Sequence, residues 1–188
     1  MNNIEISKQE LNATTEAEIM NVVNFLYEEW QREKSLEVLL RLGFLCWHTR
    51  DDQHFYRLGD ESLELLFDIF LELYEYGVQN HSDEPLFCWI FGFILSLHGY
   101  LFFDDVSNLN DLINRAVLLA PNDPLIFLTW WGNRGSRAVQ VSDTKLLKMA
   151  QAANQELYRL ENQGQIGDYL DALIRGKIKR ISSEAPQH

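Results

Sequence analysis

The sequence predicts an all-α fold, in which a single domain of about eight helices is stacked as antiparallel hairpins. Its long segments repeat their apolar residues at the spacing of one helix face, and no alternating stretch predicts a strand of any length. With 188 residues, of which 46% are hydrophobic, the chain is long enough to bury one core. We expect residues 14–180 to form the domain, and residues 1–13 and 181–188 to be disordered tails.

The N-terminal half predicts three amphipathic helices. Thr15 and Glu18 form a capping box, and the apolar face that follows predicts a helix over residues 16–32. A second apolar face predicts a helix over 36–50. The polar segment DDQHFYRLGD is interpreted as a connection, after which a third helix is expected over 60–78.

The next segment, residues 85–103, contains no Asp, Glu, Lys or Arg over nineteen positions. Its length permits a membrane span, but acidic residues flank both ends and no basic residue stands near to orient an inserted helix. Pro85 follows Asp83 and Glu84, an arrangement typical of a helix start. Because the centre of a helical bundle also requires a helix that is apolar all round, we expect a core helix and no membrane span.

Four more helices are expected in the C-terminal half. NDLINRAVLLA predicts a helix over 110–120, and Pro124 opens another. KLLKMAQAANQELYRL predicts a helix over 145–160, and DYLDALIRGKIKR predicts the last one over 168–180. The last predicted helix ends in a basic cluster: Arg175, Lys177, Lys179 and Arg180. Because cations suit the negative end of a helix dipole, this position explains the cluster more simply than a nucleic-acid site does.

Two pairs of segments in the chain resemble each other. DEPLFCWIFGF at 83–93 aligns with NDPLIFLTWWG at 122–132, and RLGFLCWH at 41–48 shares an apolar-Gly-Phe pattern with IFGFILSLH at 90–98. A glycine inside a helix often marks the close approach of a neighbouring helix. The repetition predicts stacked hairpins that bury one continuous core.

Residues 113–131, INRAVLLAPNDPLIFLTWW, resemble the junction between two tetratricopeptide repeats, where one helix ends in a proline-containing turn and a second proline opens the next helix. The matching positions are Ala116, Leu119, Pro121, Asn122 and Pro124, with Phe127 and Trp130 at the large apolar positions. The resemblance implies tetratricopeptide-like helical hairpins. It also implies scaffolding and protein binding without catalysis.

Both cysteines of the chain, Cys46 and Cys88, lie inside apolar segments. We therefore expect buried free thiols rather than a disulfide. Free thiols suit a reducing compartment, and no secretory signal is visible at the N-terminus. The sequence thus predicts a cytoplasmic protein.

Charge is unevenly distributed along the chain. Residues 1–123 contain 22 acidic and 7 basic side chains, giving −15, while residues 124–188 contain 6 acidic and 9 basic, giving +3 and a net charge of −12. No Lys or Arg occurs between Asp60 and Glu84. Five carboxylates of the third predicted helix are spaced by three or four residues and therefore share one face, here called the acidic column: Glu61, Glu64, Asp68, Glu72 and Glu75.

The simpler interpretation of the acidic column is a solvated helix face. The functional interpretation is a docking face for a basic protein, because an acidic field accelerates association with a cationic partner. We assign Asp51 and Asp52 to the same candidate surface. Nucleic acid is not expected as a partner, because its phosphates require a basic patch, and neither is a membrane. A groove lined by Phe127, Trp130 and Trp131 is the alternative binding site.

Candidates for catalysis or metal binding are few. HTRDDQH brings His48, Asp51, Asp52 and His54 together, but the spacing matches no known metal motif, and we expect no metal and no other cofactor. His98 is interpreted as a hydrogen-bonded core histidine rather than a catalytic base. The sequence contains no glycine-rich phosphate loop and no nucleophile elbow, and we expect no enzymatic activity.

The overall form, small and strongly acidic, resembles that of bacterial immunity proteins, particularly the helical ones of contact-dependent growth inhibition systems. This resemblance implies an inhibitor that neutralises a basic toxin, expected to be a nuclease, by covering its active site. The alternative is a tetratricopeptide-type secretion chaperone or adaptor that binds an extended peptide. The gene immediately upstream discriminates between them, because it encodes a toxin in the first case and secretion apparatus in the second.

Overall fold

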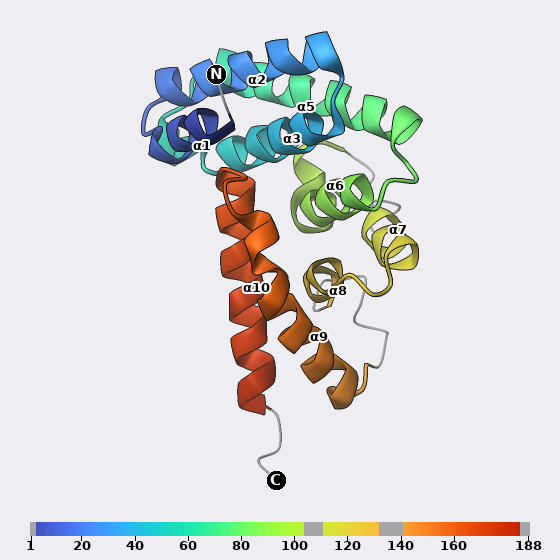
Figure 1. Cartoon of the computed structure of the whole chain (residues 1–188). Coiled ribbons are helices and arrows are strands. Elements are labelled where there is room, and N and C mark those ends of the chain that lie inside the picture. The colour runs from blue at the N-terminus through green and yellow to red at the C-terminus, as the bar shows by residue number, and fades with distance from the viewer. Residues whose placement is uncertain (1–2, 104–110, 132–140, 185–188) are drawn as a thin grey trace.

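The computed structural model describes residues 3–103, 111–131 and 141–184, which form ten α-helices and two short 3-10 helices without a strand (Figure 1). The all-α class is confirmed. The α-helices are α1 (Asn3–Asn12), α2 (Glu16–Glu33), α3 (Leu36–Asp51), α4 (Gln53–Tyr56), α5 (Asp60–Asn80), α6 (Pro85–His98), α7 (Asp111–Leu119), α8 (Pro124–Trp130), α9 (Asp143–Glu156) and α10 (Gln165–Glu184). The 3-10 helices are η1 (Gly99–Leu101) and η3 (Leu157–Leu160).

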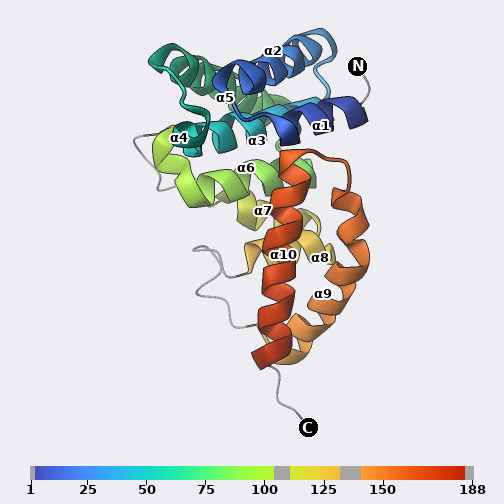
Figure 2. The ribbon, with the colours of Figure 1, turned by 90° about the vertical axis from the view of Figure 1, so that its left-hand side faces the viewer.

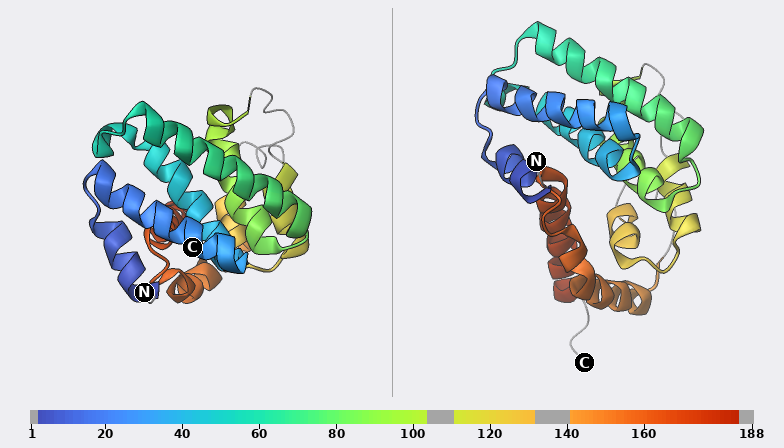
Figure 3. Two further views of the ribbon diagram at one scale, coloured as in Figure 1. Left: turned by 90° about the horizontal axis from the view of Figure 1, so that it is seen from above. Right: turned by 45° about the horizontal axis from the view of Figure 1, so that its top comes forward.

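The helices of the N-terminal half form one end of the molecule. In Figure 1, α2 and α5 lie on the outside with α3 beneath them, followed by α6 and then α7. Figure 3, seen from above, shows α2 and α5 running alongside each other. The hairpin of α9 and α10 runs across the direction of these helices, and α1 lies against the start of α10 (Figure 2).

α6 is a core helix, as its uncharged sequence predicts. All residues from Phe87 to Ser96 are buried, and the helix packs between α3 and α7. A Cβ atom on Gly92 would lie 2.3 Å from the backbone nitrogen of Ile113 in α7, and one on Gly43 of α3 would lie 2.5 Å from Cζ of Phe91. Both glycines of the repeated motif therefore mark close helix approaches, as predicted.

No helix among the described residues combines the length and the apolar character that a membrane crossing needs. The uncharged segment is expected to be helical to residue 103, but α6 ends at His98 and the chain continues in η1. Cys46 and Cys88 are both free and buried, as predicted. Burial raises the pKa of both thiols, and the Cys88 thiol donates a hydrogen bond to the carbonyl of Ser82.

Two segments without a predicted helix are helical. Residues 3–12, expected to be disordered, form α1, and the expected connection at 51–60 contains α4. α1 buries Ile6 and Glu10, and α4 buries Tyr56, whose hydroxyl accepts a hydrogen bond from Gln165. At the other end, α10 continues to Glu184, so residues 181–184 are helical rather than disordered, while residues 185–188 lie outside the described chain.

Candidate protein-binding surface

The five carboxylates of the acidic column all lie on the exposed side of α5. Asp60 and Glu61 occupy its first turn, where carboxylates suit the positive end of the helix dipole. The opposite side of α5 packs on α3 and buries Leu66, Ile69, Phe70 and Leu73. From Glu61 to Glu75 the column extends about 21 Å along the helix axis. The structure therefore presents the column to solvent as one continuous row.

None of the five carboxylates has an ion-pair partner within the described part of the chain, and only Glu72 accepts hydrogen bonds from other side chains there. Glu72 is engaged by α2, because its carboxylate accepts hydrogen bonds from the Tyr27 hydroxyl at 2.5 Å and from Nε2 of Gln31 at 3.0 Å. Burial, together with the bond to Glu72, raises the pKa of Tyr27. Glu72 thus serves the packing of α2 against α5, which the spacing of the column did not reveal.

Arg50 of α3 reaches the N-terminal part of the column without pairing with it. It lines a shallow cleft together with Asp60, Glu64 and Asp68. Its Nη1 donates to the carbonyl oxygen of Leu63 at 2.8 Å, and its guanidinium group lies over the rings of Phe67 and Phe102. The cation therefore holds α3 and α5 together, while the carboxylates beside it stay exposed.

Asp51 and Asp52, assigned to the same surface, lie at the end of α3, and each faces a histidine. Oδ1 of Asp51 is 3.3 Å from Nδ1 of His98, and Oδ2 of Asp52 is 3.6 Å from Nε2 of His48. Both aspartates are exposed, and each forms an ion pair with its histidine only when that imidazole ring is protonated.

His98 is hydrogen-bonded, as predicted, but it is half-buried rather than fully enclosed. Its Nδ1 lies 3.2 Å from Nε1 of Trp47, which can only donate, and 3.3 Å from the Asp51 carboxylate, which accepts. An unprotonated Nδ1 accepts from the indole, whereas a protonated Nδ1 donates to Asp51. The nitrogen can serve only one of these partners at a time.

The HTRDDQH segment does not assemble a metal site. The described residues contain no group of three or more His, Cys, Asp or Glu side chains suited to holding a metal ion. Nδ1 of His48 lies 2.9 Å from Oε1 of Gln165, an atom that can only accept, so this nitrogen carries the proton. His48 thereby ties α3 to the start of α10, and His54 is exposed on α4.

A buried polar junction joins α1, α3 and α10, and sequence reasoning missed it. The carboxylate of Glu10 accepts from Nε of Arg41 at 2.8 Å and from the backbone N–H of Gln165 at 2.7 Å. Arg41 also donates to the Ser7 hydroxyl at 2.9 Å. Burial raises the pKa of Glu10, although Arg41 acts in the opposite direction. No local pattern reveals this site, because Glu10 and Gln165 are far apart in the sequence.

Three of the four side chains in the basic cluster of α10 contact other residues of the same chain. Arg175 pairs with Asp171, and Arg180 lies over the ring of Trp131. Nζ of Lys177 donates to the carbonyl oxygens of Leu128, Thr129 and Trp131 at 2.7 to 3.0 Å, at the C-terminal end of α8. Burial lowers the pKa of Lys177 to about 8. This lysine therefore caps a neighbouring helix rather than its own.

The alternative groove at Phe127, Trp130 and Trp131 is not open. Phe127 and Trp130 are buried, and Nε1 of Trp130 donates to the side chain of Asn114 at 2.8 Å. Only Trp131 is partly exposed. Two of the three residues thus belong to the packing of α8, and their side chains do not line an open groove.

No protein-family model matches the chain, and no curated protein or solved structure is detectably similar to it. The function must therefore be inferred from the side chains themselves.

Proposed function

We propose that this protein binds a basic protein through the acidic column of α5 and inhibits it, as an immunity protein inhibits a toxin. The observation that carries the proposal is the row of five exposed carboxylates, none of which has an ion-pair partner among the described residues. A basic nuclease is the favoured target, because an enzyme that binds phosphates carries a cationic groove.

A comparison with α2 argues against a purely solvated face. On α2, Arg32 lies 2.6 Å from Glu29 and 3.1 Å from Glu33, so charges of both signs are interspersed. The acidic column contains no cation, and like charges at three- or four-residue spacing destabilise a helix by about 0.2 to 0.5 kcal/mol per pair. Solubility alone does not require a single sign of charge. A cationic partner would relieve this repulsion.

The expected mode of action is occlusion. A row of carboxylates attracts a cationic surface over a long range and raises the association rate, and complementary charges then fix the orientation of the complex. The inhibitor would cover the phosphate-binding groove of the toxin and compete with its nucleic-acid substrate. No chemistry by the inhibitor is needed for this effect.

A second candidate is a tetratricopeptide-type chaperone or adaptor, built as a single domain of helical hairpins. The turn between α7 and α8 favours it, because Oδ1 of Asp123 accepts from the backbone N–H groups of Leu125 and Ile126, and Pro124 opens α8. Such a protein would bind an extended segment of its client. It would leave the enzymatic activity of a folded client intact.

The two candidates are distinguished by an activity measurement on the protein encoded by the gene immediately upstream. If that protein has a basic C-terminal domain with nuclease activity, an equimolar amount of this chain should abolish cleavage of DNA or RNA. A chaperone would bind the unfolded client and leave the cleavage rate of the folded nuclease unchanged. Unchanged cleavage by a nuclease that binds the chain would contradict inhibition.

A further inference from the structure

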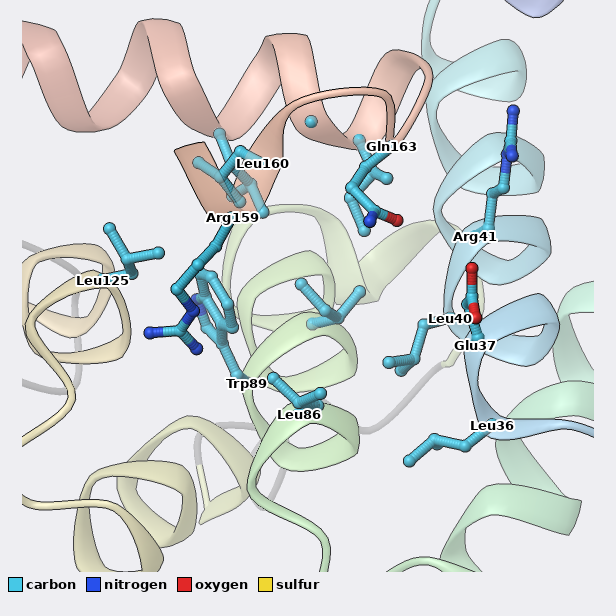
Figure 4. A pocket seen from close by; sticks show the side chains of 14 residues that line it. Leu36, Glu37, Leu40, Arg41, Leu86, Trp89, Leu125, Arg159, Leu160 and Gln163 are labelled. Atoms are coloured by element: carbon cyan, nitrogen blue, oxygen red, sulfur yellow. The ribbon is translucent and has the colours of Figure 1, made fainter. Parts of the chain in front are cut away.

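A cavity of about 370 Å³ lies between α3, α6, α8 and the segment from η3 into α10 (Figure 4). Most of its lining is aliphatic, with the indole of Trp89 on one side. Leu86, which is 41% exposed, belongs to the lining, so the cavity reaches the surface at the start of α6. The apolar wall consists of Leu36, Leu40, Leu86, Trp89, Ile90, Leu125, Leu160, Ile166 and Leu170.

The cationic side chains in the lining are already engaged. In Figure 4, the guanidinium group of Arg41 points away from the middle of the cavity, and its Nε donates to Glu10. Nη1 of Arg159 lies 2.9 Å from Asp123 and 3.8 Å from Glu156. An anionic ligand would therefore find no uncompensated cation in this site. A charged group of either sign would also lose its hydration against the aliphatic wall.

Tight backbone packing fixes one wall of the cavity. A Cβ atom on Gly167 would lie 2.1 Å from the carbonyl oxygen of Leu160, so the start of α10 can approach η3 only because this residue is glycine. Trp89 and Ile90, on the facing wall, belong to the buried part of α6. A cavity bounded by such elements is formed before any ligand arrives, as is usual for small-molecule sites.

We propose that this cavity binds an uncharged, mainly apolar small molecule. Its volume falls at the lower end of the range for ligand pockets, about 300 to 1,000 Å³. Since an apolar cavity of about 150 Å³ holds benzene, this one admits a larger molecule, such as two or three aromatic rings or an aliphatic chain of similar volume. The site is separate from the acidic column and does not depend on the proposed inhibitor function.

The test uses N-phenyl-1-naphthylamine, an uncharged probe whose fluorescence rises in an apolar environment, with the full chain. Leu86→Trp places a large side chain at the opening of the cavity. The matched control is Leu118→Trp on α7, where the leucine is 80% exposed and outside the lining. Circular dichroism and thermal unfolding verify that both variants fold.

The wild type and Leu118→Trp should bind one probe molecule with equal affinity, and Leu86→Trp should bind it about tenfold more weakly. The anionic analogue 8-anilinonaphthalene-1-sulfonate should bind the wild type more weakly than the uncharged probe. Absence of binding, or equal weakening by both tryptophan variants, would overturn the site. Tighter binding of the sulfonate would overturn the proposed ligand class.

Discussion

α5 and α6 follow each other in the chain, yet they place charge in opposite ways. α5 buries one side against α3 and presents five carboxylates on the other, whereas α6 contains no acidic residue, Lys or Arg and is buried from Phe87 to Ser96. α6 determines how closely its neighbours approach, through Gly92 and Phe91. The difference indicates that α6 serves the fold and that the outer side of α5 is available for recognition. Substitutions in the two helices should therefore have different consequences.

The largest effect is expected for a charge placed in α6. Phe93 is 2% exposed, so Phe93→Asp buries a carboxylate without a partner, which costs several kcal/mol. We expect an unfolded or aggregated protein by circular dichroism and size-exclusion chromatography. Leu65→Asp, at a 40% exposed position of α5, is the control and should remain folded. A folded Phe93→Asp variant with near wild-type stability would remove the distinction between the two helices.

The buried junction of α1, α3 and α10 provides a third case, because the charges of Glu10 and Arg41 lie inside the molecule and form an ion pair. Arg41→Met should lower the free energy of unfolding by about 3 to 5 kcal/mol, since Glu10 stays buried without its cation. Adding Glu10→Gln to Arg41→Met removes the unpaired charge and should recover most of this loss. Urea unfolding of the two variants measures both effects. A loss below about 1 kcal/mol for Arg41→Met would place this pair with weak surface ion pairs.

A smaller loss of stability is expected for Gly92→Ala, which tests the close approach of α6 and α7. Gly92→Ala should destabilise the protein by about 1 to 3 kcal/mol, because its Cβ would collide with the backbone of Ile113. Gly176→Ala in α10 is the matched control, since a Cβ there meets nothing within 4 Å and should stabilise the helix by about 0.5 to 1 kcal/mol. Thermal unfolding compares the two. Equal shifts in the same direction would contradict a tight contact at Gly92.

The sequence predicted the parts of the fold that depend on local signals. The capping box at Thr15 and Glu18 marks the start of α2, and the uncharged run identifies α6 as a core helix, because both signals lie within the helix concerned. α1 and α4 were missed, since their buried contacts include Gln165, which is distant in sequence. The chain contains no local trace of such partners.

The exposure of the acidic column was also predicted from a local signal. The regular spacing of the acidic column places all five carboxylates on the exposed side of α5, as the structure shows. Spacing within one helix cannot reveal contacts with another, so the hydrogen bonds from α2 to Glu72 and the position of His98 beside Asp51 were not foreseen. The cavity was invisible for the same reason, because its walls come from four separate parts of the chain.

The central claim is that the unpaired carboxylates of the acidic column recognise a basic protein. Asp68→Lys/Glu75→Lys reverses two of them and avoids Glu72, whose bonds to α2 support the fold. The control, Asp143→Lys/Glu161→Lys, changes the net charge equally at two exposed positions that form no ion pair within the described chain. All three proteins should have helical spectra of equal intensity.

The most direct measurement is the association rate with the basic domain encoded immediately upstream, determined by stopped flow at about 50 mM and 500 mM salt, where the Debye length falls to a few ångströms. At low salt we expect the column variant to associate at least about tenfold more slowly than the control, because rim charges act mainly on the association rate. High salt should slow the wild type more than the column variant. Equal association rates for the column variant and the control, with equal salt dependence, would show that the column is only a solvated face.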